Sequence, residues 1–407
     1  MNAESPSQAR TQFQRLSVLI GVNLVDMIGL MLVLPLLPFY AIDLGASDVT
    51  IGWLIAAFPI AQLISAPIWG RVSDRYGRRP ALVIGLTASA IAYLVFGLAS
   101  SVWLLFLSRF VQGAGGGTTG VAQAYVADTV RPADRAMALG WLSAATNIGV
   151  TFGPVLGAFA THWGRSAPGI LAAVLCAVNA WFAWRLLPES RRPAADEVKV
   201  VRKPVWDAAW QVLRHPTGPV PRYVWIYGIG MFAFTCFTSI IALFLKAEYQ
   251  VTAKTIGFFF TYIGILNLLM RLVLLGPIVR RIGETWSMRV GAGFLVIGLL
   301  LYPNTHTILQ LAIVMPLVPV GTALLFPATT SLMSRASDKR EIGTTMGVAQ
   351  TYGGVSRVMA PLLGTQVFQR VGHAWPFYMG AGMVALVSAL AFQVDHPAPT
   401  VDTPLPQ

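Results

Sequence analysis

Long apolar stretches alternate with short polar loops along this 407-residue sequence, and twelve of them are long enough to cross a bilayer. A membrane-spanning helix needs roughly 20 predominantly apolar residues. The pattern predicts twelve such helices, near residues 16–40, 50–70, 80–99, 102–127, 136–161, 168–187, 222–246, 255–277, 287–305, 307–333, 342–369 and 374–394. Only 11% of the residues are charged, against about 25% in soluble domains. We therefore expect an all-α integral membrane protein.

The basic residues lie mainly in alternate loops. Of the 29 lysines and arginines, 22 fall on one side of the predicted membrane, four on the other and three inside predicted helices. Because basic loops stay in the cytoplasm, this distribution predicts a protein of the inner (cytoplasmic) cell membrane with both termini in the cytoplasm. The net charge of +12 also suits nucleic-acid binding, but the basic residues form no clustered patch, so no nucleic-acid partner is expected.

Small residues recur at a spacing of about half the chain. Gly70 and Gly77 are repeated as Gly276 and Gly283. Internal repeats of this kind are typical of transporters whose halves rock about a central site. The predicted parts are an N-terminal six-helix half, a cytoplasmic linker and a pseudo-symmetric C-terminal six-helix half, at residues 1–187, 188–221 and 222–407. A short amphipathic helix is expected around residues 206–213 of the linker.

The loop after the second predicted helix reads G-R-V-S-D-R-Y-G-R-R-P from residue 70 to residue 80. Gly70 and Gly77 permit a tight turn, and Asp74 stands among basic residues that include Arg75 and Arg78. A carboxylate here can face a helix N-terminus, where the helix dipole favours negative charge. The arginines serve as a topology signal, but the spacing of glycine, acid and arginine is more specific than a charge bias requires.

This string resembles the signature loop of the major facilitator superfamily. In the fourth predicted helix, the sequence from Arg109 to Gly113 resembles the family's R-x-x-Q-G motif. In the fifth predicted helix, the pattern of Gly149, Gly153, Pro154 and Gly157 resembles the motif associated with antiporters. The N-terminal half is similar to twelve-span drug:proton antiporters, including tetracycline efflux proteins.

The resemblance implies that the signature loop forms a conformational latch. In the family, the acid of this loop faces the start of helix eleven, and the arginine pairs with an acid at the cytoplasmic end of helix four. Matching positions give these roles to Asp74, Arg78 and Asp128, and the predicted latch also includes Gly70, Arg75 and Gly77 of the loop. Such pairs bias one conformation only if they form in one state and break in the other.

One carboxylate, Asp26, lies near the middle of the first predicted helix, about 16 Å from its cytoplasmic end. An acid at bilayer depth is costly and usually functional. Arg109 lies about 10 Å in from the opposite surface, so an ion pair is feasible, and the family has such acid–arginine pairs. We predict that both residues couple transport to protons, with Asp26 alternating between ion-paired and protonated forms. A static structural pair and direct contact with substrate are the alternatives.

Polar side chains inside the predicted helices indicate a substrate cavity. The predicted substrate-binding residues are Asn23, Gln112, Gln123, Asn147, Asn267, Arg271, Gln350 and Arg357. Inside the helices, three arginines against one aspartate favour an anionic or zwitterionic group on the substrate. Arg271 lies close to a cytoplasmic end and can instead extend to the surface. Asn23, one turn before Asp26, is also explained as a hydrogen-bond partner of that acid.

The sequence carries no sign of catalysis, and we expect neither an enzyme nor a cofactor. Its five histidines lack metal-ligand spacing, and no phosphate-binding loop occurs, so neither a metal site nor ATP hydrolysis is expected. Tetracycline exporters carry a histidine in helix eight and further acids in helices three and nine. This chain has Asn267, Ala92 and no acid at the matching places, which argues against a metal–tetracycline substrate.

The sequence thus predicts a secondary active transporter that exports a small amphipathic drug or metabolite in exchange for protons, by alternating access. Transport of an organic anion, such as a carboxylate metabolite or a siderophore, is the alternative substrate class. A transport-dead sensor or scaffold of the same fold is the alternative of another kind. The expected partners are a small-molecule substrate, protons and the lipid bilayer, and the protein is expected to be a monomer.

Overall fold

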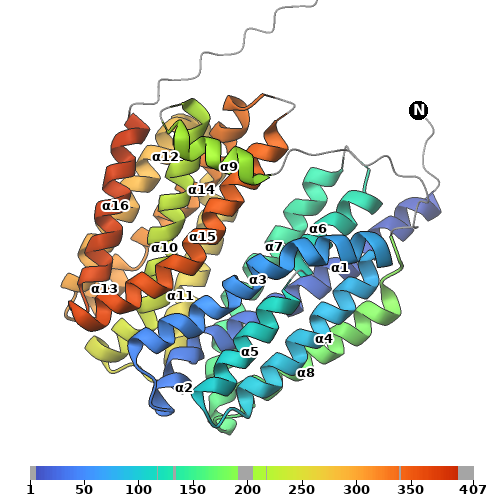
Figure 1. The fold of residues 1–407 in the computed structure, drawn as a ribbon, viewed down its shortest axis with the longest axis horizontal. Helices are drawn as coiled ribbons and strands as arrows, with labels where there is room; N and C mark the ends of the chain where they lie inside the picture. The colour runs from blue at the N-terminus through green and yellow to red at the C-terminus, as the bar shows by residue number, and fades with distance from the viewer. Residues whose placement is uncertain are drawn as a thin grey trace, which may run out of the picture. The chain divides into compact units, whose positions relative to one another are not determined.

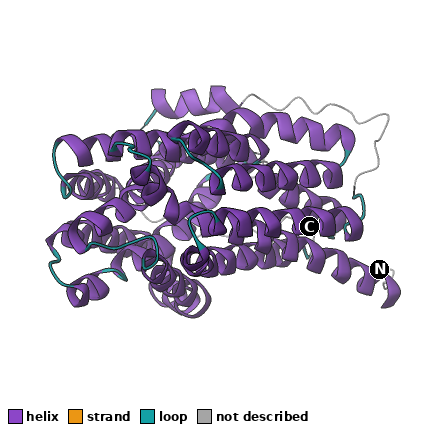
Figure 2. Ribbon diagram, turned by 90° about the horizontal axis from the view of Figure 1, so that it is seen from below, coloured by secondary structure: helices purple, strands orange, loops and turns teal. Residues whose placement is uncertain are grey.

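The computed structural model describes residues 6–116, 118–131, 134–190, 205–216, 218–338 and 341–392. Within these ranges the chain consists of helices joined by short loops, and no strand occurs (Figure 2). The prediction of an all-α protein is therefore confirmed.

The helices are labelled in chain order (Figure 1). They are α1 (Pro6–Val33), η1 (Leu34–Leu36), α2 (Leu37–Asp43), α3 (Asp48–Tyr76), α4 (Arg78–Gly97), α5 (Val102–Gly115), α6 (Thr118–Thr129), α7 (Arg135–Ala160), η2 (Thr161–Trp163), α8 (Ala167–Leu186), α9 (Val205–Arg214), α10 (Pro219–Tyr249), α11 (Ile256–Leu269), η3 (Met270–Leu274), α12 (Leu275–Leu301), η4 (Tyr302–Asn304), α13 (Ile308–Val314), α14 (Leu317–Ala336), α15 (Ile342–Arg370) and α16 (Trp375–Phe392). The short helix expected in the linker is present as α9.

Eight stretches of the described chain are helical, apolar and long enough to cross a membrane. One of them, Ile256–Asn304, has 49 residues and covers two predicted spans. Three predicted spans lie outside this set, namely 102–127, 342–369 and 374–394. The first is divided between α5 and α6, whereas the other two form the helices α15 and α16. All three segments are therefore helical at the predicted places.

Local sequence signals set the ends of several helices. The side chain of Ser47 accepts a hydrogen bond from Thr50 N at 3.2 Å and caps α3, and Thr307 caps α13 in the same way. α3 ends at Gly77, whose φ of 105° is a conformation that favours glycine. The first span is longer than predicted and bends through η1, where Pro35 interrupts regular helix.

The fourth span was predicted as one helix but breaks after Gly115. Consecutive glycines have low helix propensity, and Gly116 N donates to Gly113 O, three residues back, instead of continuing the α-helical pattern. Backbone groups freed at membrane depth need other partners. Side chains of α3 supply them: Gln62 Nε2 donates to Gly116 O at 3.0 Å, Ser65 Oγ to Gly113 O at 3.2 Å and Trp69 Nε1 to Ala114 O at 2.5 Å.

The chain divides into two compact units. Unit 1 comprises Met1–Val200, Cys236–Leu269 and Arg357–Pro376. Within it, α1 packs on α7 and α8, α3 on α5, α4 on α8, and α11 on α7. Unit 2 comprises Val201–Thr235, Met270–Ser356 and Phe377–Gln407, and its main contact joins α12 to α14. All of the predicted coupling and latch residues therefore belong to unit 1.

Candidate functional site

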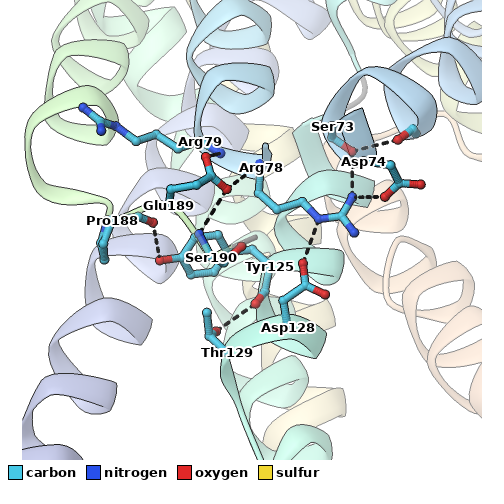
Figure 3. Close-up of polar contacts among 11 residues, drawn as sticks. Ser73, Asp74, Arg78, Arg79, Tyr125, Asp128, Thr129, Pro188, Glu189 and Ser190 are labelled. Atoms are coloured by element: carbon cyan, nitrogen blue, oxygen red, sulfur yellow. Dashed lines mark hydrogen bonds and ion pairs between the residues drawn. The ribbon is translucent and has the colours of Figure 1, made fainter. Parts of the chain in front are cut away.

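One buried arginine connects the helices around the signature loop (Figure 3). Arg78, the first residue of α4, forms ion pairs from Nη1 to Asp74 Oδ1 at 2.7 Å and from Nε to Asp128 Oδ2 at 2.9 Å. Its Nη1 also donates to Ser73 Oγ at 2.8 Å. The Arg78 side chain is 8% exposed, whereas that of Asp74 is 53% exposed. The structure thus brings three predicted latch residues together, from the ends of α3, α4 and α6.

Glu189, which the sequence analysis missed, completes this cluster. Its carboxylate accepts hydrogen bonds from the backbone N of Arg78 at 2.8 Å and of Arg79 at 3.1 Å (Figure 3). The first N–H groups of a helix have no partner inside it, and its positive end favours an anion. Glu189 therefore caps α4. The available signal was an acid directly after Pro188, within a basic stretch at the end of α8.

The space around Gly77 depends on this cap. A Cβ at Gly77 would overlap the carboxylate of Glu189, and the positive φ independently favours glycine. Tyr125 Oη donates to Pro188 O at 2.8 Å and so fixes the chain that carries Glu189 (Figure 3). The positive φ of the turn therefore favours glycine at this position, and a Cβ there would also displace the Glu189 carboxylate.

The other two predicted loop residues have more open surroundings. A Cβ at Gly70 would meet no atom within 4 Å, and Gly70 O accepts from Ser73 Oγ at 3.0 Å. The guanidinium carbon of Arg75 lies 5.4 Å from the centroid of the Tyr76 ring. Packing in this structure does not explain the glycine at position 70.

Asp26 lies in α1, is 8% exposed, and accepts a hydrogen bond at 3.0 Å from Thr118 Oγ1. Thr118 opens α6, directly after the break in the fourth span. A Cβ at Gly85 of α4 would lie 2.8 Å from Cγ2 of Thr118, so glycine allows α4 to approach there. The break thus directs a hydroxyl group toward the buried acid.

Arg109 of α5 is 1% exposed, and its Nε, Nη1 and Nη2 have no hydrogen-bond partner in the structure. Its guanidinium carbon lies 5.9 Å from the ring centroid of Tyr93 and 5.3 Å from that of Phe96. Gln112 Nε2 donates to Tyr93 Oη. Asp26 and Arg109 are therefore not hydrogen-bonded to each other in this structure, and their ion pair stays a prediction for another state.

The glycines of the antiporter-type motif lie where α7 meets α1. Added Cβ atoms at Gly149 and Gly153 would each come within 2.6 Å of a methionine Cβ on α1, and one at Gly157 would overlap Leu32 O. Pro154 lies inside α7 in the same stretch. Small residues of this kind allow membrane helices to approach closely. The motif therefore permits tight packing against the helix that carries Asp26.

Asn23 connects the same two helices. It is 4% exposed, and its Nδ2 donates to Leu142 O at 3.1 Å and to Thr146 Oγ1 at 2.8 Å. Both acceptors belong to α7. The amide nitrogen of Asn23 is thus used in helix packing.

The remaining predicted substrate residues are divided between the units. In unit 1, Asn147 Nδ2 donates to Ser143 O at 2.8 Å, Asn267 Nδ2 donates to Ile263 O at 3.2 Å, Gln123 is exposed and Arg357 is half-buried. In unit 2, Gln350 Nε2 donates to Tyr227 Oη at 3.5 Å, and Arg271 is exposed within η3, a π-helical turn. A binding site formed by these residues remains a prediction.

The sequence as a whole matches a known family. The model of the Major Facilitator Superfamily matches residues 19–238 and 223–407. Tetracycline resistance protein, class C, of Escherichia coli is 29% identical over 399 residues, which cover 94% of this chain and 96% of the relative. Multidrug resistance protein 1 of Bacillus subtilis (strain 168) is 28% identical over 393 residues, covering 94% and 97% of the two chains.

Solved structures show the same fold. The human organic anion transporter MFSD10 (TETRAN) has a TM-score of 0.68 at 22% identity, over 95% of this chain and 100% of that chain. A mutant of the nucleoside transporter NupG has a TM-score of 0.78 at 13% identity, over 93% and 99% of the two chains. These likenesses confirm the predicted fold of twelve membrane-spanning helices.

Proposed function

We propose that this chain, which belongs to the Major Facilitator Superfamily, exports a small amphipathic compound in exchange for protons. Membership of that family makes it a multi-pass secondary transporter and not an enzyme. The compound is a drug or a metabolite. The likeness to tetracycline and multidrug resistance proteins supports export, since 28–29% identity extends over nearly the whole chain.

The observation that carries proton coupling is the separation of Asp26 from Arg109. Both side chains are buried, yet Asp26 accepts from a neutral hydroxyl group and Arg109 has no hydrogen-bond partner. A buried cation without a counter-ion is unfavourable, so this arrangement fits a cycle in which the acid has taken up a proton and released the arginine. Return of the arginine to the carboxylate would favour loss of that proton.

Flux measured in vesicles tests this proposal. Purified protein is reconstituted with a panel of fluorescent amphipathic cations and neutral compounds, and a pH difference is imposed. A difference of one pH unit is expected to support about tenfold accumulation by one-for-one exchange. A protonophore combined with a potassium ionophore should abolish the accumulation. Flux that is absent for the entire panel would instead support the sensor or scaffold reading.

The proposal includes a topology and a mode of movement. The protein lies in the inner membrane of the cell with both termini in the cytoplasm. It works as a monomer, and rocking of residues 1–187 against residues 222–407 opens the substrate site alternately to the two sides. Asp74, Arg78 and Asp128 act as a cytoplasmic latch in this cycle. The network around Arg78 supports the last part, since it joins the ends of three helices.

An organic anion is the second candidate substrate. The observation that favours it is the buried Arg109, whose guanidinium group has no hydrogen-bond partner in the structure. Arg357, half-buried midway along α15, is a second cation inside a predicted span. An anionic substrate would supply a counter-ion for Arg109.

Replacement of Arg357 by alanine separates the two substrate classes. If Arg357 binds an anionic group, Arg357→Ala should weaken binding of anionic compounds by about tenfold or more, because a hydrogen bond to a charged group is lost. Neutral compounds of similar size should be little affected. Arg370→Ala, on the exposed end of the same helix, is the matched control. Binding measured by thermal shift that falls equally for both classes would count against a charge-reading role.

A further inference from the structure

A long apolar groove runs along the surface of unit 1 between α4 and α8, which lie side by side (Figure 1). Its volume is about 570 Å³. Ala90, Ala173 and Ala180 are buried at its floor, whereas large side chains such as Leu94 and Trp181 stand exposed along it. Thr87, its one polar lining residue, satisfies its hydroxyl by donating to Val83 O at 2.8 Å. The groove is therefore shaped for a hydrocarbon chain.

One end of the groove is basic. Arg79 and Arg185 flank Trp184, which lines the groove at this end. Arg79 Nη2 donates to Trp184 O, and its Nε has no hydrogen-bond partner. The Arg185 guanidinium carbon lies 5.4 Å from the Trp184 ring centroid. The carboxylate of Glu189 accepts from the backbone N of Arg79 and not from its side chain. Two cationic side chains, those of Arg79 and Arg185, therefore lie beside Trp184 at this end of the groove.

The length of the groove fits one lipid leaflet. From Val83 to Leu94 the axis of α4 rises about 16 Å, close to half of a hydrocarbon core of about 30 Å. Val83 lies one helical turn from Arg79, so a chain in the groove would place its headgroup beside the arginines. We infer that this groove binds one anionic phospholipid, with an acyl chain between α4 and α8 and the phosphate at Arg79 and Arg185.

Native mass spectrometry of the full-length protein tests this inference. The protein in mild detergent is incubated with an equimolar mixture of phosphatidylglycerol and phosphatidylcholine that carry the same acyl chains. We expect one retained lipid per chain, mainly phosphatidylglycerol. Arg185→Gln should lower its preference over phosphatidylcholine about fivefold. Arg71→Gln, an exposed arginine on α3, removes the same charge elsewhere and should change nothing.

A second variant fills the groove itself. Ala177 lines the groove and is exposed, so Ala177→Trp should remove the adducts of both lipids without disturbing helix packing. Val178→Trp places the same side chain on the next exposed residue, which does not line the groove, and should retain the adducts. If Ala177→Trp does not fold, Arg185→Gln alone decides.

Three results would overturn the inference. Equal retention of both phospholipids, unchanged in Arg185→Gln, would mean ordinary surrounding lipid. A dimer that dissociates in Ala177→Trp would make the groove a contact between two copies of the chain. Displacement of the retained phosphatidylglycerol by an uncharged amphipathic compound would assign the groove to that compound.

Discussion

Replacement of Asp26 by asparagine is expected to abolish proton-driven accumulation while the protein stays folded. Asparagine has nearly the size of aspartate, and its side-chain oxygen can still accept from Thr118 Oγ1. It cannot take up or release a proton. The change therefore removes the titrating group and retains the observed hydrogen bond, which separates coupling from packing.

The size of this effect follows from the driving force. With one pH unit imposed, the unmodified protein should approach about tenfold accumulation, whereas Asp26→Asn should reach a ratio of about one. Exchange down a substrate gradient should continue, because it needs no proton. Asp43→Asn provides the control, since this acid lies at the exposed end of α2. Uphill accumulation that survives in Asp26→Asn would require another coupling residue.

Replacement of Arg78 by glutamine is expected to produce the second large effect, a shift in the balance between inward-open and outward-open forms. The change removes ion pairs to Asp74 and Asp128 and leaves two acids facing each other without the intervening cation. Couplings of this kind alter conformational equilibria by about 5–150-fold. Because Asp74 is 53% exposed, solvent screens its pair, so we expect the lower part of this range.

Labelling of single engineered cysteines on either side of the membrane measures this shift, in a background without Cys176 and Cys236. Arg71→Gln is the matched control, because Arg71 is an exposed arginine of the same loop sequence and is not among the predicted latch residues. Thermal unfolding checks that both variants remain folded. Identical labelling rates for Arg78→Gln and the unmodified protein would remove the latch from the mechanism.

The helices could be predicted from the sequence because membrane spans are local in sequence. Each needs only enough apolar residues, and charge bias then orders the loops. The partners of Arg78 could be predicted for a different reason. The motif of its loop resembles a family signature, and that resemblance points to Asp128, 50 positions away. Neither step requires knowledge of how helices rotate about their axes.

The sequence did not reveal how each helix is oriented about its own axis, and therefore which side chains face each other. Depth along the bilayer made an Asp26–Arg109 contact feasible, but the structure turns Asp26 toward Thr118 and places Arg109 against aromatic rings. Glu189 was missed because its partner Arg78 lies 111 positions earlier and is contacted through backbone N–H, which has no sequence signature. Contacts between distant segments depend on packing that periodicity alone leaves undetermined.

The interrupted fourth span has a consequence for reading natural variants of this protein. Trp69→Phe keeps an apolar aromatic ring and does not lower the hydropathy of the span, yet it removes the donor to Ala114 O. If no other donor replaces the indole, an unsatisfied carbonyl at membrane depth costs several kcal/mol. A conservative substitution on α3 can thus destabilise the end of α5, and second-site mutations that restore stability are expected near Gly116.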